Sequence, residues 1–359
     1  MSANTSGVST HHPRARGHLG RLVLVLFLAL AGLGAGAAWF YHHEWKDVED
    51  VDYLGNIGGA MRVSEGDALK LDPDLKDSDG DLVADAPSDP VKQLDPPTLI
   101  FAPLPGPRGE VAGVWDEFKE HLAKVTGKAV EYRDLPNPIE LRRLLREGKI
   151  HVCGVNTGAV RAAVNAGFVP VCVPAAADGS FGYELEFLVP ASGAAKTLKD
   201  LKGKVLTLTD TSSHSGYKAA LVVLKKDSQL TPGKDVTITM SGSHDASIRA
   251  LAAKRCDAVS VASDLLHRAE ANGVIKASDY RSIYKSPKFP PAAYGYVFNL
   301  NPALAAKVRE AFLQFDWKGT GLEKSLGPTG NAKFAPVSYK DDWKYVREID
   351  QELLSWGNK

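Results

Sequence analysis

Residues 201–221 read "LKGKVLTLTDTSSHSGYKAAL", and this stretch contains the pattern that decides the fold. A short apolar run is followed by a loop of small hydroxyl residues and one histidine, and the loop leads into an apolar helical segment. Residues 235–256, "DVTITMSGSHDASIRALAAKRC", repeat this order of strand, small polar loop and helix. Such units predict an α/β fold in which ligands bind at the carboxyl ends of the strands.

The alternation extends in both directions from these two units. Upstream, "TLIFAPL", "AVEYRDL", "IHVCGV" and "FVPVCVPA" are predicted strands separated by amphipathic helices. One of these helices, "NPIELRRLLREGK", begins with a capping Asn137 and with Pro138 in its first turn. We therefore expect mostly parallel sheets with helices on both faces, starting at residue 98.

An apolar run from Leu22 to Tyr41 precedes this region. About 20 residues of helix cross a hydrocarbon core of about 30 Å, so residues 22–41 are predicted to be a transmembrane anchor. Arginines precede the run and acids follow it, which places residues 1–21 in the cytoplasm and the rest outside. A signal peptide cleaved after the small residues 35–37 is the alternative, and it also exports the rest of the chain.

Residues 42–97 are predicted to be an acidic flexible linker, because they are rich in Asp, Gly and Pro and show no periodicity. Within them, "DSDGDLVADAPSD" has alternating aspartates, spaced like the acidic calcium loops of thrombospondin type 3 repeats. Calcium prefers six to eight oxygen ligands, and a loop of this kind supplies several. A weak calcium site or a solvated acidic loop are the two interpretations, and the candidate ligands are Asp77, Asp79, Asp81 and Asp85.

Composition narrows the function. The 359 residues contain 43 basic and 43 acidic side chains, so no general attraction to nucleic acid is expected. The three cysteines have no metal-binding or CxxC spacing and are predicted to be buried, inert thiols. No cofactor other than the possible calcium is expected.

Three segments together resemble a known family: "LREGKIHVCGVNTGAV" (145–160), "LKDLKGKVLTLTDTSSHSGY" (198–217) and "SGSHDASIRALAAKRCDAVSVASD" (241–264). They resemble the substrate-binding proteins of ABC importers for phosphonate, phosphite and phosphate (PhnD-like). The resemblance implies a two-lobed periplasmic-binding-protein fold with type II topology over residues 98–359. Lobe 1 would comprise about 98–187 plus 293–359, lobe 2 about 188–292, and the ligand would lie in the cleft between them.

Helix N-termini leave N–H groups unpaired, so a small polar loop that opens a helix can bind an oxyanion. The resemblance places Ser213, His214 and Ser215 in the family's oxyanion loop and His244 on its ligand histidine. It places Asp264 where some members have an acid that contacts a ligand amine. Asn156 and Thr157 could donate from the other lobe. The same residues could instead be ordinary helix caps.

Two departures from the family bear on the ligand. Ala292 stands where binders of aminoethylphosphonate have an acid, and Val160 stands where many members have an aromatic or hydroxyl residue. Phosphate, phosphite or a phosphonate without an amine is therefore expected, delivered to an ABC permease. A histidine beside an anion should be charged, which predicts binding that tightens from about pH 8 to about pH 6.

Two other functions are alternatives to a binding protein. Ser213, His244 and Asp245 could be written as a serine hydrolase triad, but no strained nucleophile elbow is visible and Asp245 directly follows the histidine. We therefore expect no enzyme. A membrane-anchored sensor or scaffold domain of the same fold is the second alternative.

Overall fold

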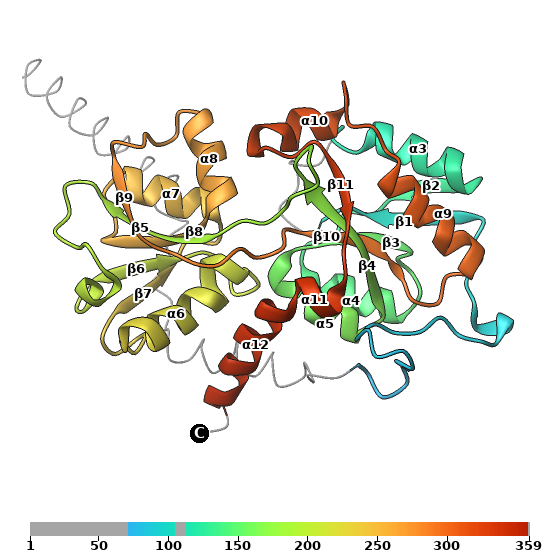
Figure 1. Cartoon of the computed structure of the whole chain (residues 1–359), viewed down its shortest axis with the longest axis horizontal. Helices are drawn as coiled ribbons and strands as arrows, with labels where there is room; N and C mark the ends of the chain where they lie inside the picture. Colours follow the sequence, from blue (N-terminus) through green and yellow to red (C-terminus); the bar gives the residue numbers. More distant parts are fainter. Residues whose placement is uncertain (1–70, 105–112, 358–359) are drawn as a thin grey trace, which may run out of the picture. The chain divides into compact units, whose positions relative to one another are not determined.

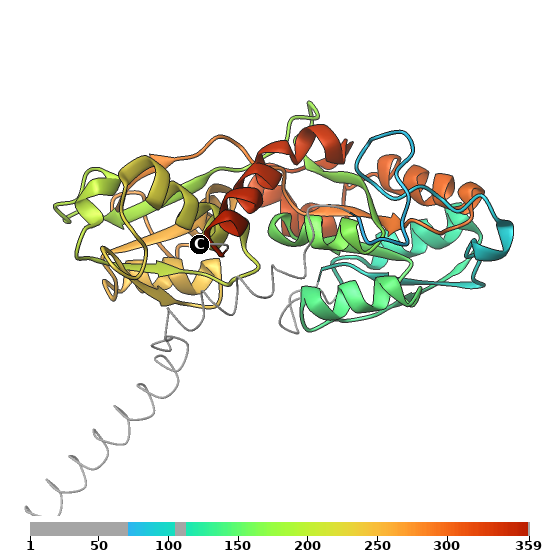
Figure 2. The ribbon, with the colours of Figure 1, turned by 90° about the horizontal axis from the view of Figure 1, so that it is seen from below.

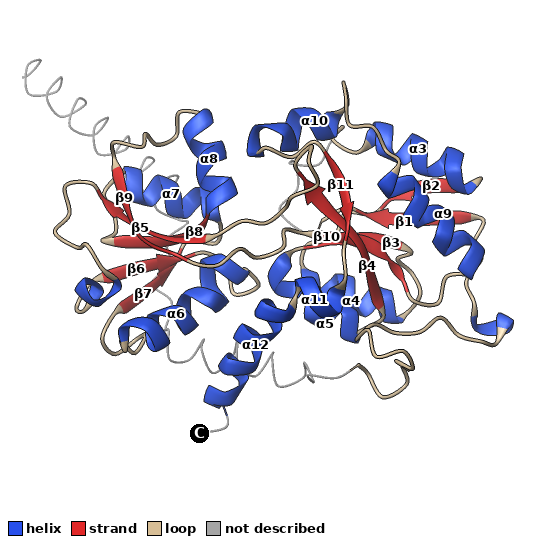
Figure 3. Ribbon diagram, viewed as in Figure 1, coloured by secondary structure: helices blue, strands red, loops and turns tan. Residues whose placement is uncertain are grey.

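The computed structural model describes residues 71–104 and 113–357. These residues form a six-stranded and a five-stranded sheet, and helices pack against each sheet (Figures 1 and 3). The predicted transmembrane segment 22–41 lies outside the described residues. Among the helices of the described residues, none combines the length and the apolar character that a membrane span requires.

The six-stranded sheet has the order β11-β4-β10-β3-β1-β2. β1 pairs in parallel with β2 and β3, whereas β10 lies antiparallel between β3 and β4, and β11 is antiparallel to β4. The strands are β1 (Thr98–Ala102), β2 (Ala129–Tyr132), β3 (Val152–Val155), β4 (Phe168–Ala175), β10 (Ala293–Val297) and β11 (Lys333–Pro336).

Local sequence signals set the ends of the helices around this sheet. Asn137 accepts a hydrogen bond from the Glu140 N–H and caps α4, as its sequence predicts. Gly127 ends α3 with a φ of 73°, a left-handed conformation that glycine adopts without strain. The helices are α3 (Asp116–Thr126), α4 (Pro138–Arg146), α5 (Val160–Asn165), α9 (Pro302–Leu313), α10 (Gly321–Leu326), α11 (Tyr339–Asp342) and α12 (Lys344–Gly357); the short turns η1 (Pro90–Lys92), η2 (Thr157–Ala159) and η5 (Gly327–Thr329) lie between them.

The five-stranded sheet has the order β7-β6-β8-β5-β9. β6 pairs in parallel with β7 and β8, and β5 is antiparallel to β8 and β9. The strands are β5 (Leu185–Pro190), β6 (Val205–Leu208), β7 (Thr237–Met240), β8 (Ala258–Ala262) and β9 (Tyr280–Lys285). The helices are α6 (Ala219–Ser228), α7 (His244–Ala252) and α8 (Ser263–Ala271), with the turns η3 (Leu198–Leu201) and η4 (His214–Lys218).

The expectation of mostly parallel sheets needs a correction. β5 and β10 are the first strands after the chain crosses from one sheet to the other, and each enters its new sheet antiparallel to both neighbours. Periodicity identifies a strand but not the sheet that it joins, so this mixture could not be read locally. Counted from β2 in one sheet and from β7 in the other, the crossing strand is the fourth member of each sheet. This is the type II arrangement that the resemblance implied.

Residues 71–97 also differ from the expected linker, because they are fixed to the six-stranded sheet and its helices. The N–H of Asp72 donates to the carbonyl of Asn165 at 3.1 Å, and the N–H of Leu94 donates to the carbonyl of Asn299 at 2.7 Å. Val83 is buried and belongs to the hydrophobic core. These contacts join residues far apart in the sequence, so the Pro- and Asp-rich composition of the segment could not predict them.

Aromatic side chains fill the core beside the six-stranded sheet. The Phe101 ring lies 5.4 Å from Trp115 and 5.6 Å from Phe118, both edge-on. Such pairs add about 0.5–1.5 kcal/mol beyond the burial of their area. Cys153, Cys172 and Cys256 are buried and free, as predicted, and burial raises the pKa of each thiol.

Candidate functional site

Three loops of the five-stranded sheet meet at one edge. β6 pairs in parallel with both β7 and β8, so the carboxyl ends of these strands lie together. The loop after β6 leads to η4, the loop after β7 leads to α7, and β8 leads directly into α8. Ser213, His244 and Asp264, which are far apart in the sequence, stand at these three positions.

Ser213 and His244 are hydrogen-bonded, with 3.1 Å between Oγ and Nε2. The other ring nitrogen of His244, Nδ1, accepts the backbone N–H of Ala262 at 3.1 Å. Burial of the imidazole, assisted by the charge of Arg268, lowers the pKa of His244 to about 4, so the ring is neutral near pH 7. Because Nδ1 accepts, the proton of the neutral ring is on Nε2, which therefore donates to Ser213.

The Ser213 hydroxyl can therefore take part in a further hydrogen bond only as a donor. Its oxygen accepts Nε2–H from His244 and also the backbone N–H of Gly216 at 3.0 Å. A serine oxygen has two acceptor positions and one proton. With both acceptor positions used, the O–H can only donate, and the partner that it lacks is an acceptor such as an oxyanion.

Two further hydroxyls at this edge have no partner among the described residues. Ser215 Oγ and Thr209 Oγ1 are buried, each side chain belonging to a residue that is 1% exposed. A buried hydroxyl without a hydrogen bond costs about 1–3 kcal/mol. A Cβ on Gly216 would lie 2.0 Å from Thr209 Oγ1, so only glycine permits this close approach. Ser215 is therefore a second hydroxyl at this edge without a hydrogen bond of ordinary geometry, although it lies near enough to the Tyr183 phenol to lower the pKa of that group.

The Tyr183 phenol lies near Ser215, Thr157 and Asp264, because all three affect its pKa. Burial is the main cause that raises the pKa of the Tyr183 phenol, and the charge of Asp264 adds to it; the hydroxyls of Thr157 and Ser215 oppose the rise. Burial also raises the pKa of Asp264, although the Leu265 N–H, which donates to its Oδ1 at 2.9 Å, works against this. The carboxyl of Asp264 and the hydroxyl of Ser215 are therefore both close to the Tyr183 phenol.

Asn156 and Thr157 connect the η2 turn to the other side of this neighbourhood. Asn156 caps η2 through the Ala159 N–H at 3.0 Å, and its amide nitrogen lies 3.4 Å from Ser212 Oγ. Thr157 donates its hydroxyl proton to the carbonyl of Pro290 at 2.8 Å. Thr157 is therefore placed as an acceptor rather than as the anion donor that its position in the sequence suggested.

His214 is near the serines in sequence but has different neighbours. Its ring is 1% exposed and packs edge-on against Phe289, with 4.5 Å between the centroids. Burial lowers the pKa of His214 to about 3, against the opposing charge of Asp350, and neither ring nitrogen has a partner among the described residues. The structure therefore places the His214 ring in an apolar contact beside α12. Both imidazoles are therefore neutral in the ligand-free chain, and the expected pH dependence of binding stays a prediction about the anion-bound state.

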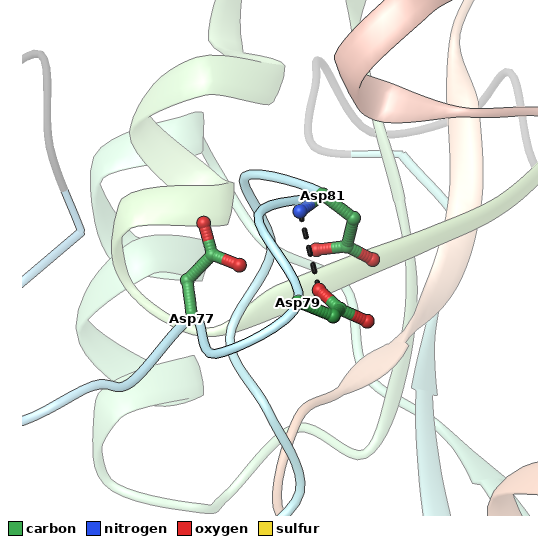
Figure 4. A group of neighbouring side chains, drawn as sticks. All are labelled: Asp77, Asp79 and Asp81. Atoms are coloured by element: carbon green, nitrogen blue, oxygen red, sulfur yellow. Dashed lines mark hydrogen bonds between the residues drawn. The ribbon is translucent and has the colours of Figure 1, made fainter.

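The aspartate loop lies outside this edge. The ligand oxygens of Asp77, Asp79 and Asp81 lie within 4.8 Å of one another, with two of the three side chains exposed (Figure 4). Backbone N–H groups of the same loop donate to these carboxylates: Gly80 and Leu82 to Asp77, Asp81 to Asp79, and Val83 to Asp81. Asp85 instead accepts the N–H and hydroxyl of Ser78. Burial, with the neighbouring carboxylates, raises the pKa of Asp81. The calcium site stays a prediction.

Comparison with known proteins places this geometry in a family. Residues 106–343 match the model of the periplasmic substrate-binding proteins of phosphonate ABC transporters. The chain belongs to this family. The resemblance of the three sequence segments is thereby confirmed. The family's members are substrate-binding proteins. In this arrangement the lone pair on His244 Nδ1 accepts the Ala262 N–H, so Nε2 carries the proton and does not accept one from Ser213.

Solved structures share the fold of this phosphonate-binding family member. A binding protein component of an ABC phosphonate transporter from Pseudomonas aeruginosa is 20% identical, with a TM-score of 0.60 over 74% of this chain and 90% of that one. PhnD1 from Prochlorococcus marinus, solved with methylphosphonate, is 16% identical, with a TM-score of 0.60 over 72% of this chain and 99% of that one. A Xanthomonas citri protein solved with chloride is 17% identical, with a TM-score of 0.57 over 73% and 98%.

Sequence reasoning missed three polar residues of this region. Tyr183 and Thr209 were not singled out, although each is next to a predicted turn or loop. Asp350 was also missed, because no predicted strand or helix covered residues 344–357. A signal was present: Asp350 lies between Val346, Ile349 and Leu353, where an acid interrupts an apolar helical stripe.

Proposed function

We propose that this protein captures a small phosphorus oxyanion without an amine, such as methylphosphonate, phosphite or phosphate, for an ABC importer. The observation that carries this proposal is the Ser213 hydroxyl, whose oxygen accepts from both His244 and Gly216 and whose proton is left for an acceptor. Ser215 supplies a second unpartnered hydroxyl. PhnD1 from Prochlorococcus marinus, which shares the fold, was solved with methylphosphonate.

Asp264 supports a ligand that carries a proton. An ionised carboxylate beside an anion is repulsive unless one of the two groups holds a proton. A phosphonate or phosphate monoanion has a P–OH group that can donate to Asp264, whereas a sulfonate has none. The raised pKa of Asp264 is consistent with a position where a proton is shared. Preference for phosphorus oxyanions over sulfonates follows from this proton.

Calorimetry on the full chain tests the proposal. Methylphosphonate, phosphite, phosphate and ethanesulfonate would be titrated at pH 7, into wild type and Ser215→Ala. We expect binding of at least one phosphorus oxyanion, weaker binding of ethanesulfonate, and a loss of about 10- to 150-fold in Ser215→Ala, the range for hydrogen bonds to charged groups. If no phosphorus oxyanion bound to the wild type, the proposed ligand class would be wrong.

We further propose that residues 22–41 anchor the protein in the cytoplasmic membrane, with the binding domain on the extracytoplasmic side. The apolar length of this segment and the arginines before it support the proposal. The same arrangement would suit a membrane-anchored sensor, which is the second candidate function. Growth on methylphosphonate as the phosphorus source, with and without this gene, separates the importer from the sensor, because only the importer is needed for uptake in a strain that expresses the permease constitutively.

A further inference from the structure

Lys218 joins the two turns that carry the candidate ligand residues. It is the last residue of η4, which begins directly after Ser213. Its ammonium donates to the carbonyl of Gly158 in η2 at 2.8 Å and lies 3.1 Å from the Asp350 carboxylate. η4 belongs to the chain around the five-stranded sheet and η2 to the chain around the six-stranded sheet. One side chain thus connects both halves of the candidate site.

Asp350 fixes the position of this ammonium. Its side chain is 1% exposed, and its second oxygen lies 2.9 Å from Arg161 Nε in α5. Burial acts to raise the pKa of Asp350, but the charges of Lys218 and Arg161 outweigh it and hold the pKa below its ordinary value. The carboxylate is therefore ionised at neutral pH, and Arg161 keeps it in place independently of Lys218.

Helix α12, which contains Asp350, contacts helices on both halves of the chain. Beyond Asp350, Glu352 lies 2.7 Å from the Lys226 ammonium, and the Lys225 ammonium lies 4.0 Å from the centre of the Trp356 ring. Both lysines are in α6, and Figures 1 and 2 show α12 running beside that helix. In the other direction, the Asp350–Arg161 pair holds α12 to α5.

The backbones of the two turns are also in direct contact. A Cβ added to Gly158 would lie 2.2 Å from the Ser212 carbonyl oxygen and 2.9 Å from the His214 nitrogen. Glycine is therefore needed for this approach. The Lys218 bond to the Gly158 carbonyl acts at the same place, so any movement of η4 away from η2 must break it.

We propose that Lys218 is a positioning residue: its bonds to Gly158 and Asp350 hold η4 against η2 before the ligand arrives and so pre-organise the anion site. The consequence for affinity rests on the proposed function, whereas the loop contact itself does not. Without the ammonium, the binding-competent arrangement is less populated, and the apparent affinity falls in proportion to that population.

Hydrogen exchange on the full, ligand-free chain tests the contact directly. In Lys218→Met we expect amide exchange to accelerate by about tenfold or more in the peptides that cover 156–161 and 212–217, because bonds to a charged group are lost. Exchange elsewhere, and the pairing of Asp350 with Arg161, should persist. Lys218→Arg keeps the charge and should restore slow exchange.

A matched control is Lys226→Met, which removes a different ion pair to the same helix, α12, from a lysine of α6 whose side chain is 55% exposed. It should leave amide exchange in both peptides, 156–161 and 212–217, unchanged. Gly158→Ala, which forces η2 from η4 by sterics alone, should accelerate both. Unchanged exchange in Lys218→Met, or acceleration spread over the whole chain, would overturn the proposal.

Methylphosphonate calorimetry on the same variants provides the functional readout. Lys218→Met should weaken binding by about tenfold and Lys218→Arg by much less. If the wild type bound no methylphosphonate, the proposed ligand would be wrong, but the exchange result would still decide whether Lys218 holds the two turns together. If Lys218→Met bound methylphosphonate as well as the wild type while its turns exchanged faster, the contact would exist without a positioning role.

Discussion

Replacing Ser213 by alanine should damage ligand binding and stability by separable amounts. The change removes a hydroxyl that accepts from Gly216 and from His244 and that has one proton left to donate. Loss of the donated bond to an anion should cost about 1.5–3 kcal/mol of binding free energy, which is about 10- to 150-fold in Kd. Methylphosphonate calorimetry measures this loss.

The stability effect comes from the two bonds that Ser213 accepts. Losing the cap on η4 costs about 0.5–2 kcal/mol. The Nε2–H of His244 would also lose its acceptor, at about 1–3 kcal/mol if water does not replace it. The free energy of unfolding should therefore fall by about 1.5–5 kcal/mol if no water replaces the lost acceptor, more than for an ordinary surface serine. Denaturant titration on the full chain measures it.

Ser243→Ala is the matched control. Ser243 caps α7 through the Ala246 N–H at 3.1 Å and is exposed, so its loss costs a cap without removing a donor to the ligand. It should lower stability by about 1 kcal/mol and leave the Kd unchanged. Wild-type affinity in Ser213→Ala would refute the assignment of the hydroxyl to the anion. A matching loss in Ser243→Ala would show that the effect is only structural.

Three other outcomes are expected. Ethanesulfonate, whose charge is constant, should bind more weakly as pH rises through the raised pKa of Asp264, because a protonated carboxyl donates a hydrogen bond to an anion and an ionised one repels it. Calorimetry over a pH series that begins near the ordinary carboxyl pKa of 3.8, on wild type and Asp264→Asn, checks this, and a slope that persists in the variant would contradict it. If the aspartate loop binds calcium, millimolar CaCl₂ should raise the Tm of wild type but not of Asp79→Ala, and equal shifts would remove the site. Protease added to intact cells should release a soluble fragment containing residues 98–359, whereas a mature N-terminus at Ala38 would establish cleavage instead.

The loops of the site were predictable because their signals are local. A strand, a run of small polar residues and a helix follow one another between 205 and 228, and again between 237 and 252, and both helices form there. Parallel pairing of β6 with β7 and β8 then brings Ser213 and His244 together without further information. Short-range periodicity and helix caps were sufficient for this part of the fold.

The state of the histidines could not be predicted in the same way. Whether His244 is charged depends on the Ala262 N–H, 18 residues away, which fills Nδ1, and on burial by side chains from other elements. The surroundings and the pKa of His214 depend on Phe289 and Asp350, which are further still along the chain. The expected gain in affinity between pH 8 and 6 assumed two solvated imidazoles beside an anion. With pKa values lowered to about 3 and about 4 in the ligand-free chain, neither ring titrates in that interval unless a bound anion raises its pKa.

Neutral histidines change how the anion would be held. The cation nearest in sequence to the serines, Lys218, already has the Gly158 carbonyl and the Asp350 carboxylate as partners. The remaining donors are hydroxyl groups, one of them oriented by an uncharged imidazole that is itself fixed by a backbone N–H. Fixed dipoles in a buried site stabilise charge without the desolvation cost of burying a cation, and they do not reorganise when the ligand arrives. In the proposed site, selectivity would come from the number of donors and from the proton shared between Asp264 and the ligand, rather than from net charge.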